Sequence, residues 1–305
     1  GNGLYCYLGP YEGGRLAVAE AARNVACTGA RPLAITNCLN FGSPAKPEIF
    51  YQLAEAVRGI GDACRALNTP VTGGNVSLYN ENPQGAIWPT PIVGMVGRIE
   101  GPARPVPSGF PQAGLDLYLL GPRAEHLGGS EYVRWKTEKE HGPCPTCDLG
   151  REKALIEVLV TGAREGVIAS AQDCGVGGLA VVLAECVLQS AEGVGAEIEA
   201  GYLAGGRDLL LVELFGETAG RVVVSAAAGQ SERLETLCRE QGVEFRRIGC
   251  TVTAGEQNAA EPELTIRSGS AEVRVRRSEI RSAFESTDAI FPPSEAAELA
   301  FSGHV

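Results

Sequence analysis

The residues best suited to chemistry lie at positions 69–80, which read Thr-Pro-Val-Thr-Gly-Gly-Asn-Val-Ser-Leu-Tyr-Asn. The pattern predicts a buried strand that runs into Gly73-Gly74 and then presents Asn75 and Ser77. Side chains two residues apart in an extended chain point to the same side. The glycines let backbone N–H groups approach phosphate oxygens closely. A plain turn or bulge at a strand end is the alternative interpretation.

Other polar side chains also stand at predicted strand ends. Asn37 ends an earlier strand, and Gln172 and Asp173 end a strand in the second half of the chain. Ligands of open α/β sheets gather at strand ends, so these residues are candidates to line one cleft. The amide oxygen of an asparagine, together with phosphate oxygens, suits Mg²⁺. An equal alternative is that Asn37 and Asn75 satisfy backbone groups of turns.

Several other site classes are excluded by their missing motifs. The chain has no Gly-x-x-x-x-Gly-Lys-Ser/Thr loop, and no Gly-x-Gly-x-x-Gly between a strand and a helix. Its three histidines, His126, His141 and His304, lie in predicted loops or the tail without a partner at fixed spacing. A histidine-based catalytic triad is therefore not expected.

The charge balance argues against nucleic acid as a partner. The formal net charge is −11, whereas affinity for a phosphate backbone comes from clustered Lys and Arg. The single basic run contains Arg274, Arg276, Arg277 and Arg281, is interrupted by Glu279, and has no interleaved aromatic residue. We interpret it as a solvated strand face followed by a helix start.

The ten cysteines predict reduced thiols, because the chain is long and shows no export signal. Cys144 and Cys147 form a single Cys-x-x-Cys in a proline-rich loop, for which loop cysteines are favoured over a metal or redox site. No apolar run is long enough to span a bilayer, so a cytoplasmic location is expected. The chain begins with Gly1 and its single methionine is Met95, which indicates a piece of a longer protein.

The secondary-structure pattern predicts an α/β (α+β) fold in two domains, residues 1–106 and 107–305, separated by a proline- and glycine-rich linker over 101–114. Apolar residues at 44% and charged residues at 21% are typical of folded globular proteins. A loose tail is expected after about residue 293. The first domain is predicted to hold strands at 4–8, 32–39, 69–77 and 89–99 and helices at 15–28 and 47–67. The second is predicted to hold strands at 115–121, 167–173, 208–214, 221–226, 245–251 and 264–266 and helices at 151–165, 179–190, 231–241 and 279–285.

A series of sequence blocks closely resembles the second half of the phosphoribosylformylglycinamidine synthase family, and the blocks cover nearly the whole chain in order. They are Pro-Tyr-Glu-Gly (10–13), Ala-Glu-Ala-Ala-Arg-Asn (19–24), Cys-Leu-Asn-Phe-Gly (38–42), Gly-Asn-Val-Ser-Leu-Tyr-Asn-Glu (74–81), Pro-Thr-Pro (89–91), Leu-Gly-Gly-Ser-Glu-Tyr (127–132), Gly-Gly-Leu-Ala (177–180) and Leu-Phe-Gly-Glu (214–217).

The resemblance implies a duplicated enzyme, of which this chain is the C-terminal half. Each half pairs a small N-terminal α/β domain with a larger α/β domain of the aminoimidazole ribonucleotide synthetase type. The implied activity is that of an ATP- and Mg²⁺-dependent ligase of purine biosynthesis, which converts formylglycinamide ribonucleotide and glutamine-derived ammonia to formylglycinamidine ribonucleotide. The implied partners are the N-terminal half of the same polypeptide, a glutaminase subunit and a small accessory subunit, with neither nucleic acid nor membrane.

The resemblance also implies roles for individual residues. Asn37 and Gly74 correspond to ATP contacts, Asn75 to a magnesium ligand and Ser77 to a substrate contact. No catalytic residue is expected in this chain, because the family's catalytic histidines belong to the first half. Asn37 stands where the family usually has Asp.

The segment from Gln172 through Asp173 to Gly178 also departs from the family's second-half pattern, which leaves the role of these two residues open. Two other hypotheses remain. One is a non-catalytic half that holds a nucleotide and docks the glutaminase, and the other is a stand-alone relative such as an aminoimidazole ribonucleotide or selenophosphate synthetase. The missing start methionine and the order of the blocks count against the stand-alone relative.

Overall fold

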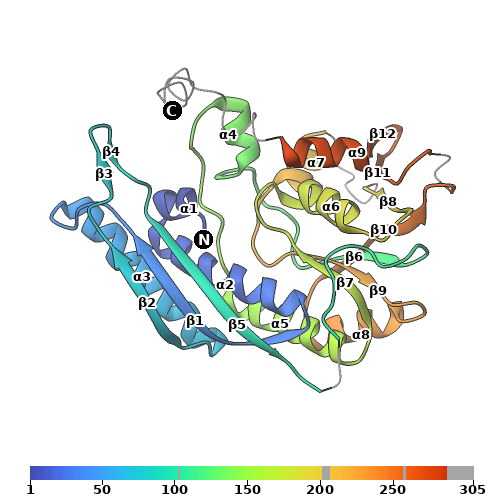
Figure 1. Cartoon of the computed structure of the whole chain (residues 1–305), viewed down its shortest axis with the longest axis horizontal. Coiled ribbons are helices and arrows are strands. Elements are labelled where there is room, and N and C mark those ends of the chain that lie inside the picture. Colours follow the sequence, from blue (N-terminus) through green and yellow to red (C-terminus); the bar gives the residue numbers. More distant parts are fainter. Residues whose placement is uncertain (102–103, 201–206, 257–258, 287–305) are drawn as a thin grey trace, which may run out of the picture.

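The computed structural model describes residues 1–305 except 102–103, 201–206, 257–258 and 287–305 (Figure 1). The tail expected after about residue 293 lies outside the described residues. Within the described ranges, no helix is long and apolar enough to cross a bilayer.

The N-terminal part of the chain forms a three-stranded sheet in the order β2-β1-β5, with helices packed on one face (Figure 1). The central strand pairs in parallel with β2 and antiparallel with β5. The helices close a core against the inner face of the sheet, which confirms the predicted layer of two long helices on a sheet. The elements are α1 (Gly3–Leu8), α2 (Pro10–Cys27), β1 (Ala30–Asn40), α3 (Pro47–Leu67), β2 (Val71–Ser77), β5 (Thr90–Ile99) and the small hairpin β3 (Glu81–Asn82) and β4 (Gly85–Ala86).

The first predicted element is wrong in type, because residues 4–8 belong to helix α1 rather than to a strand. The reason is the cap. The Oδ1 atom of Asn2 accepts hydrogen bonds from the backbone N–H of Leu4 at 2.9 Å and of Tyr5 at 3.3 Å, which satisfies free donors of a first helical turn.

Helices α2 and α3 approach closely because glycines stand at their contact. A Cβ atom on Gly14 would lie 2.3 Å from the carbonyl oxygen of Ala56, and one on Gly59 would lie 2.1 Å from that of Tyr11. Neither distance can be tolerated by a side chain. These glycines therefore fix how α3 lies against α2.

The C-terminal part forms a seven-stranded mixed sheet in the order β12-β11-β8-β10-β6-β9-β7. Helices α5 and α8 close one core against it, and α6 and α9 close another, in agreement with the predicted mixture of strands and helices. The elements are β6 (Asp116–Leu120), α4 (Glu131–Thr137), α5 (Leu149–Arg164), β7 (Ile168–Asp173), α6 (Gly178–Gln189), β8 (Val194–Glu199), α7 (Arg207–Phe215), β9 (Val222–Ala226), α8 (Ser231–Gln241), β10 (Phe245–Thr253), β11 (Glu263–Ser268), β12 (Ala271–Arg276) and α9 (Arg277–Glu285).

One prediction for this half is wrong, and one strand was missed. Residues 208–214 lie in helix α7, not in a strand, since a short apolar run fits either element. The carboxylate of Glu213, near the end of this helix, accepts a hydrogen bond from the fully buried Arg221 at 2.7 Å. Strand β8 was not predicted at all, although Val194, Ala196 and Ile198 alternate with polar positions.

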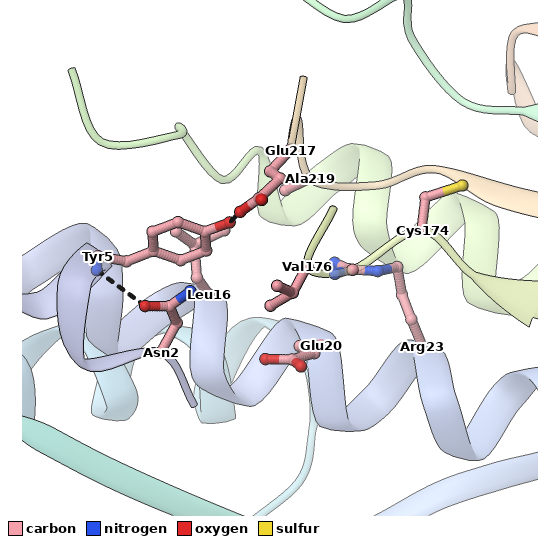
Figure 2. A pocket seen from close by; sticks show the side chains of 10 residues that line it. Asn2, Tyr5, Leu16, Glu20, Arg23, Cys174, Val176, Glu217 and Ala219 are labelled. Atoms are coloured by element: carbon pink, nitrogen blue, oxygen red, sulfur yellow. Dashed lines mark hydrogen bonds between the residues drawn. The ribbon is translucent and has the colours of Figure 1, made fainter. Parts of the chain in front are cut away.

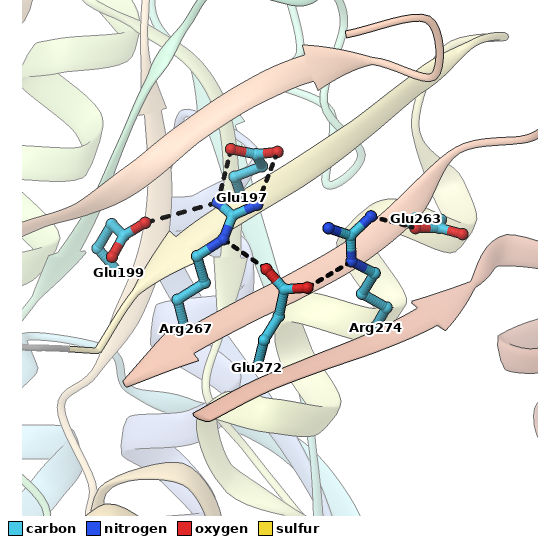
Figure 3. Close-up of polar contacts among 6 residues, drawn as sticks. All are labelled: Glu197, Glu199, Glu263, Arg267, Glu272 and Arg274. Atoms are coloured by element: carbon cyan, nitrogen blue, oxygen red, sulfur yellow. Dashed lines mark hydrogen bonds and ion pairs between the residues drawn. The ribbon is translucent and has the colours of Figure 1, made fainter. Parts of the chain in front are cut away.

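The outer strands of the large sheet carry a charged face (Figure 3). Arg267 pairs with Glu197 at 2.8 Å and with Glu272 at 2.7 Å, and Arg274 pairs with Glu272 at 2.6 Å. Arg276, at the end of β12, pairs with Glu279 in the first turn of α9. The basic run is therefore a solvated strand face and a helix start, as predicted. Arg274 and Arg276 pair with carboxylates, whereas Arg277 donates to the backbone oxygens of Val187 and Ser190.

Helix α2 packs against both sheets of this chain. Its residues Ala22, Ala26 and Cys27 lie in a core cluster with α5 and α8, while Val18 lies in the core under the small sheet. Figure 1 shows α2 between the two sheets. One helix thus joins the two layers.

A buried ion cluster centred on Arg23 fixes this junction. Its guanidinium donates from Nε to Oδ1 of Asp173 at 2.7 Å and from Nη1 to Oε1 of Glu152 at 2.5 Å. All three side chains are almost fully buried. An α2 residue therefore holds α5 and the end of β7 through charge-assisted hydrogen bonds.

We predict that Arg23→Met lowers the free energy of unfolding by about 3–5 kcal/mol, because it leaves two buried carboxylates without their cation. Urea unfolding followed by circular dichroism measures the change. Arg233→Met is the matched control, since Arg233 and Glu165 pair at 2.9 Å on the surface, where such pairs contribute about 0–1 kcal/mol. Adding Glu152→Gln and Asp173→Asn to Arg23→Met should restore most of the loss. An equal effect of the two single variants would contradict this account.

Candidate functional site

Three of the four candidate site residues, Gly74, Asn75 and Ser77, lie on β2, and Asn37 lies on the neighbouring β1. Strand β2 was predicted to be buried but is exposed. The reason is its position at the edge of the small sheet, where β1 is its one partner strand among the described residues. Residues 71–76 are all exposed, and Ser77 is half-buried. An edge strand with free N–H and C=O groups is open to a ligand or to another chain.

Asn75 and Ser77 lie on the face of the small sheet opposite the helices. The strand register aligns Cys38 with Asn75 on one side and with Ile92 on the other, and aligns Asn40 with Ser77. Paired residues share a face of a sheet, so Asn75 and Ser77 point to the same side, as expected. We call this surface the outer sheet face; its positions are Ala34, Thr36, Cys38, Asn40, Gly73, Asn75, Ser77, Ile92, Gly94 and Val96.

The outer sheet face has no helix packed on it among the described residues. The side chains of Ile92 and Val96 are 50% and 64% exposed there. The polar side chains of Asn75 and Ser77 therefore lie next to exposed aliphatic side chains. This composition is typical of a surface that a partner covers.

Gly74 and Asn37 are adjacent but lie on the inner face. They are paired in the register of β1 and β2. A Cβ atom on Gly74 would lie 2.3 Å from both the backbone oxygen and Oδ1 of Asn37. The four predicted site residues thus meet at one end of β2, two on each face, and only glycine fits beside Asn37.

The turn after β2 is tied to the turn after β1 by a side chain that the sequence analysis did not single out. Nδ2 of Asn80 donates to the backbone oxygens of Ser77 at 2.9 Å and Phe41 at 3.1 Å. Glu81 accepts from the backbone N–H of Ser43 at 2.7 Å and pairs with Lys46 at 2.9 Å. These contacts hold Ser77 in place. The signal in the sequence was the Asn-Glu pair at the end of the predicted stretch.

Asp173 and Gln172 do not join this edge, so the prediction of one cleft for all strand-end residues is wrong. Asp173 is 5% exposed and bonds to Arg23, and Gln172 donates to Oε2 of Glu185 at 3.3 Å. Helix α2 contacts β7 as well as β1 and β5, so it separates the two strand ends. Burial raises the pKa of Asp173 to about 6, although Arg23 opposes the shift. This carboxylate is a structural group.

A small cavity lies where α1 and α2 meet the glycine loop before α6 (Figure 2). Its volume of about 30 Å³ suits a single water molecule and excludes a nucleotide. Glu217, in its wall, accepts hydrogen bonds from the hydroxyl of Tyr5 and from the backbone N–H groups of Glu131 at 2.8 Å and Gly177 at 2.9 Å. The carboxylate thus occupies donors of the glycine loop and links it to α1 and α4.

The cysteines of the predicted loop are buried in part or in full. Cys147 is 3% exposed, and the Sγ atom of Cys144 donates to the backbone oxygen of Tyr5 at 3.5 Å. Burial raises the pKa of both thiols to about 12. Both are therefore neutral thiols at pH 7. A metal ligand or a nucleophile would have to be a thiolate, so neither role is supported.

Comparison with known proteins places this geometry in a family. Residues 1–99 match the model of the AIR synthase related protein, N-terminal domain, and residues 112–261 match that of the C-terminal domain. The chain belongs to the AIR synthase related protein family. The first segment covers the small sheet with its helices, and the second covers the large sheet from β6 to β10, which confirms the predicted fold type.

Curated relatives are longer than this chain. It is 48% identical over 257 residues to phosphoribosylformylglycinamidine synthase subunit PurL of Parafrankia sp., covering 84% of this chain and 32% of that protein. It is 49% identical over 251 residues to the subunit of the same name from Moorella thermoacetica, covering 82% and 33%. The resemblance stated from the sequence blocks is thus confirmed, and the chain spans about a third of these relatives.

Solved structures share the fold at low sequence identity. Thermotoga maritima PurL complexed with ATP superposes with a TM-score of 0.68 at 20% identity, covering 90% of this chain and 42% of that one. The same protein complexed with FGAR gives a TM-score of 0.70 at 19% identity, covering 90% and 43%. The protein tt0281 from Thermus thermophilus gives 0.61 at 21% identity, covering 85% and 79%.

We predict that Gly74→Ala lowers the free energy of unfolding by about 1–3 kcal/mol, since its Cβ collides with Asn37 and β1 must shift. Gly73→Ala is the matched control, because a Cβ there meets no atom within 4 Å. Thermal unfolding of the two variants measures the difference. Equal melting temperatures would show that the contact between Asn37 and Gly74 is not tight.

Proposed function

We propose that this chain is the C-terminal half of an ATP-dependent ligase that converts formylglycinamide ribonucleotide and glutamine-derived ammonia to formylglycinamidine ribonucleotide. The observation that supports this most is the exposed end of β2, where Gly74, Asn75 and Ser77 stand on an uncovered sheet. The identity of about 48% to longer synthase subunits, about a third of whose length aligns with this chain, supports the same activity.

In the proposed reaction, ATP transfers its terminal phosphoryl group to the amide oxygen of the ribonucleotide. Ammonia then adds to the activated carbon and phosphate leaves, so that ADP, phosphate and the amidine are the products. The described residues of this chain contribute binding groups to the reaction, and the general acid and base come from the other half. The isolated chain should therefore not hydrolyse ATP.

The residues at the end of β2 fit a magnesium nucleotide only as part of a larger site. The exposed amide of Asn75 offers one neutral oxygen ligand, and no group of three or more His, Cys, Asp or Glu side chains within the described ranges is arranged to hold a metal. Mg²⁺ commonly takes one or two protein ligands together with phosphates and water. When bound, the ion would neutralise phosphate charge.

We assign the remaining contacts by position. Gly74 and Asn37 would contact ATP at the free edge of β2, where the small glycine lets the backbone approach the phosphates, and Ser77 would contact the ribonucleotide on the outer sheet face. Asn37 keeps a hydrogen-bonding group in place of a charged one. Phosphate binding would then depend on backbone dipoles and the metal rather than on this side chain.

The outer sheet face would be covered by the N-terminal half of the same polypeptide. Its mixture of exposed Ile92 and Val96 with Asn75 and Ser77 supports a partner that buries aliphatic groups and completes a polar site. We further propose a glutaminase and a small accessory subunit as partners in the cytoplasm. A solved structure described as PurLQS from Thermotoga maritima, with a TM-score of 0.65, supports such an assembly.

We also propose that the two domains meet between residues 106 and 107. The backbone N–H of Val106 donates to the carbonyl oxygen of Thr28 in the first domain, at 3.0 Å. The next carbonyl oxygen, that of Pro107, accepts from the N–H of Ala171 in the second, at 3.0 Å. The backbone therefore changes partners at this point.

We predict that Asn75→Ala, in the full-length enzyme that contains this chain, raises the Mg²⁺ concentration for half-maximal rate by about tenfold or more. Asn75→Asp should lose less, because it keeps an oxygen ligand. ADP release with ATP, formylglycinamide ribonucleotide and ammonia measures the rate across a magnesium titration. An unchanged rate and magnesium requirement for Asn75→Ala would remove Asn75 from the metal site.

The same full-length enzyme also distinguishes the proposed ligase from the alternative, in which this half of the enzyme holds a nucleotide without catalysis. Ammonia-dependent ADP release that requires the ribonucleotide supports the ligase. ADP that stays bound through purification of the full-length protein and never turns over would instead support a structural nucleotide.

A further inference from the structure

We propose that Asn80 is a positioning residue that sets the hydroxyl of Ser77 as a hydrogen-bond donor toward an acceptor oxygen of the substrate. This inference rests on the proposed function, because it concerns the residue assigned there to the ribonucleotide. Asn80 itself does not have to touch the substrate.

The hydrogen bonds of Asn80 converge on one residue. Its Nδ2 atom lies 2.9 Å from the backbone oxygen of Ser77, 3.2 Å from Ser77 Oγ and 3.1 Å from the backbone oxygen of Phe41. An amide nitrogen has two hydrogens. These two hydrogens serve three acceptor oxygens, so at least one of them is shared. The Oγ atom of Ser77 is therefore a hydrogen-bond acceptor of the Asn80 amide.

The proton of the same hydroxyl is weakly engaged. Among the described residues, its acceptor is Oδ1 of Asn80 at 3.4 Å, which is longer than the usual 2.5–3.0 Å of an O–H···O hydrogen bond. A better acceptor on the outer sheet face, such as a phosphate, carbonyl or sugar oxygen, would take this proton. Ser77 would then select an oxygen acceptor and not a donor.

The backbone around Asn80 is built to keep this arrangement. Tyr79 has φ of 61°, a left-handed conformation that a residue with a bulky side chain seldom adopts. It is held by bonds on both sides, from Tyr79 N–H to Gly42 at 3.2 Å and from Asn80 N–H to Phe41 at 3.1 Å. The tight turn brings the Asn80 amide back onto Ser77 three residues earlier.

The test uses the full-length enzyme with Ser77→Ala, Asn80→Ala, Asn80→Asp and the double variant Ser77→Ala with Asn80→Ala. KM for formylglycinamide ribonucleotide, KM for ATP, kcat and the melting temperature are measured for each. Asn82→Ala is the matched control, because its Oδ1 accepts from Gln84 and Gly85 within the nearby hairpin and has no bond to Ser77.

We expect Ser77→Ala and Asn80→Ala each to raise KM for the ribonucleotide about tenfold, as the loss of one hydrogen bond does, with KM for ATP unchanged. The double variant should be no worse than Ser77→Ala, because Asn80 acts through that hydroxyl. Asn80→Asp is isosteric, and its carboxylate should capture the proton of Ser77, so its KM should rise at least as much. Asn82→Ala should match the unsubstituted enzyme.

Three results would overturn the inference. Asn80→Ala with an unchanged KM is one, and effects that multiply in the double variant are another, since both would make Asn80 independent of Ser77. The third is a Ser77→Ala enzyme with an unchanged KM, which would remove the role of Ser77 as well. A lack of ligase activity in the unsubstituted enzyme would instead refute the proposed function before any variant is compared.

Discussion

The rest of the structure depends on the burial of Arg23 between the two layers. A guanidinium in the interior needs carboxylates at close range, and Asp173 and Glu152 supply them from β7 and α5. This requirement fixes α2 against the large sheet while the other side of α2 packs on the small one. Because the helices are committed to the inner face of the small sheet, its outer face is left without a cover from the described residues.

That constraint explains where the candidate site can be. The polar end of β2 is not enclosed by the described residues of the second domain. The cavity between the two layers, lined by Tyr5, Glu217 and the glycine loop, is too small for a nucleotide. The large sheet ends in paired charges that satisfy one another (Figure 3). The outer sheet face instead combines the exposed aliphatic side chains of Ile92 and Val96 with Asn75 and Ser77. A ligand bound there would lie between this chain and a partner surface.

The sequence predicted the long elements and the shared face of Asn75 and Ser77, because hydrophobic period and residue spacing are local properties. It failed where a distant partner decides the outcome. Residues 208–214 form a helix whose Glu213 pairs with Arg221, and β2 is exposed because no strand of the described residues pairs on its free side. Residues 194–199 form a strand, and their alternation of apolar with other residues is a local signal for it. Asp173 ends a strand as Asn75 does, yet only its distant contact with Arg23 shows that it is structural.

The central claim, that another part of the full protein covers the outer sheet face, can be tested with the thiol of Cys38. Cys38 lies on that face between Asn75 and Ile92 and is half-buried, while the half-buried Cys250 lies on β10 of the large sheet. Alkylation rates of both thiols are measured by peptide mass spectrometry in this chain alone and in the full-length protein. The account predicts that Cys38 reacts in the isolated chain and much more slowly in the full-length protein, while Cys250 changes little. Equal reactivity of Cys38 in both would show that the face stays open and would contradict it.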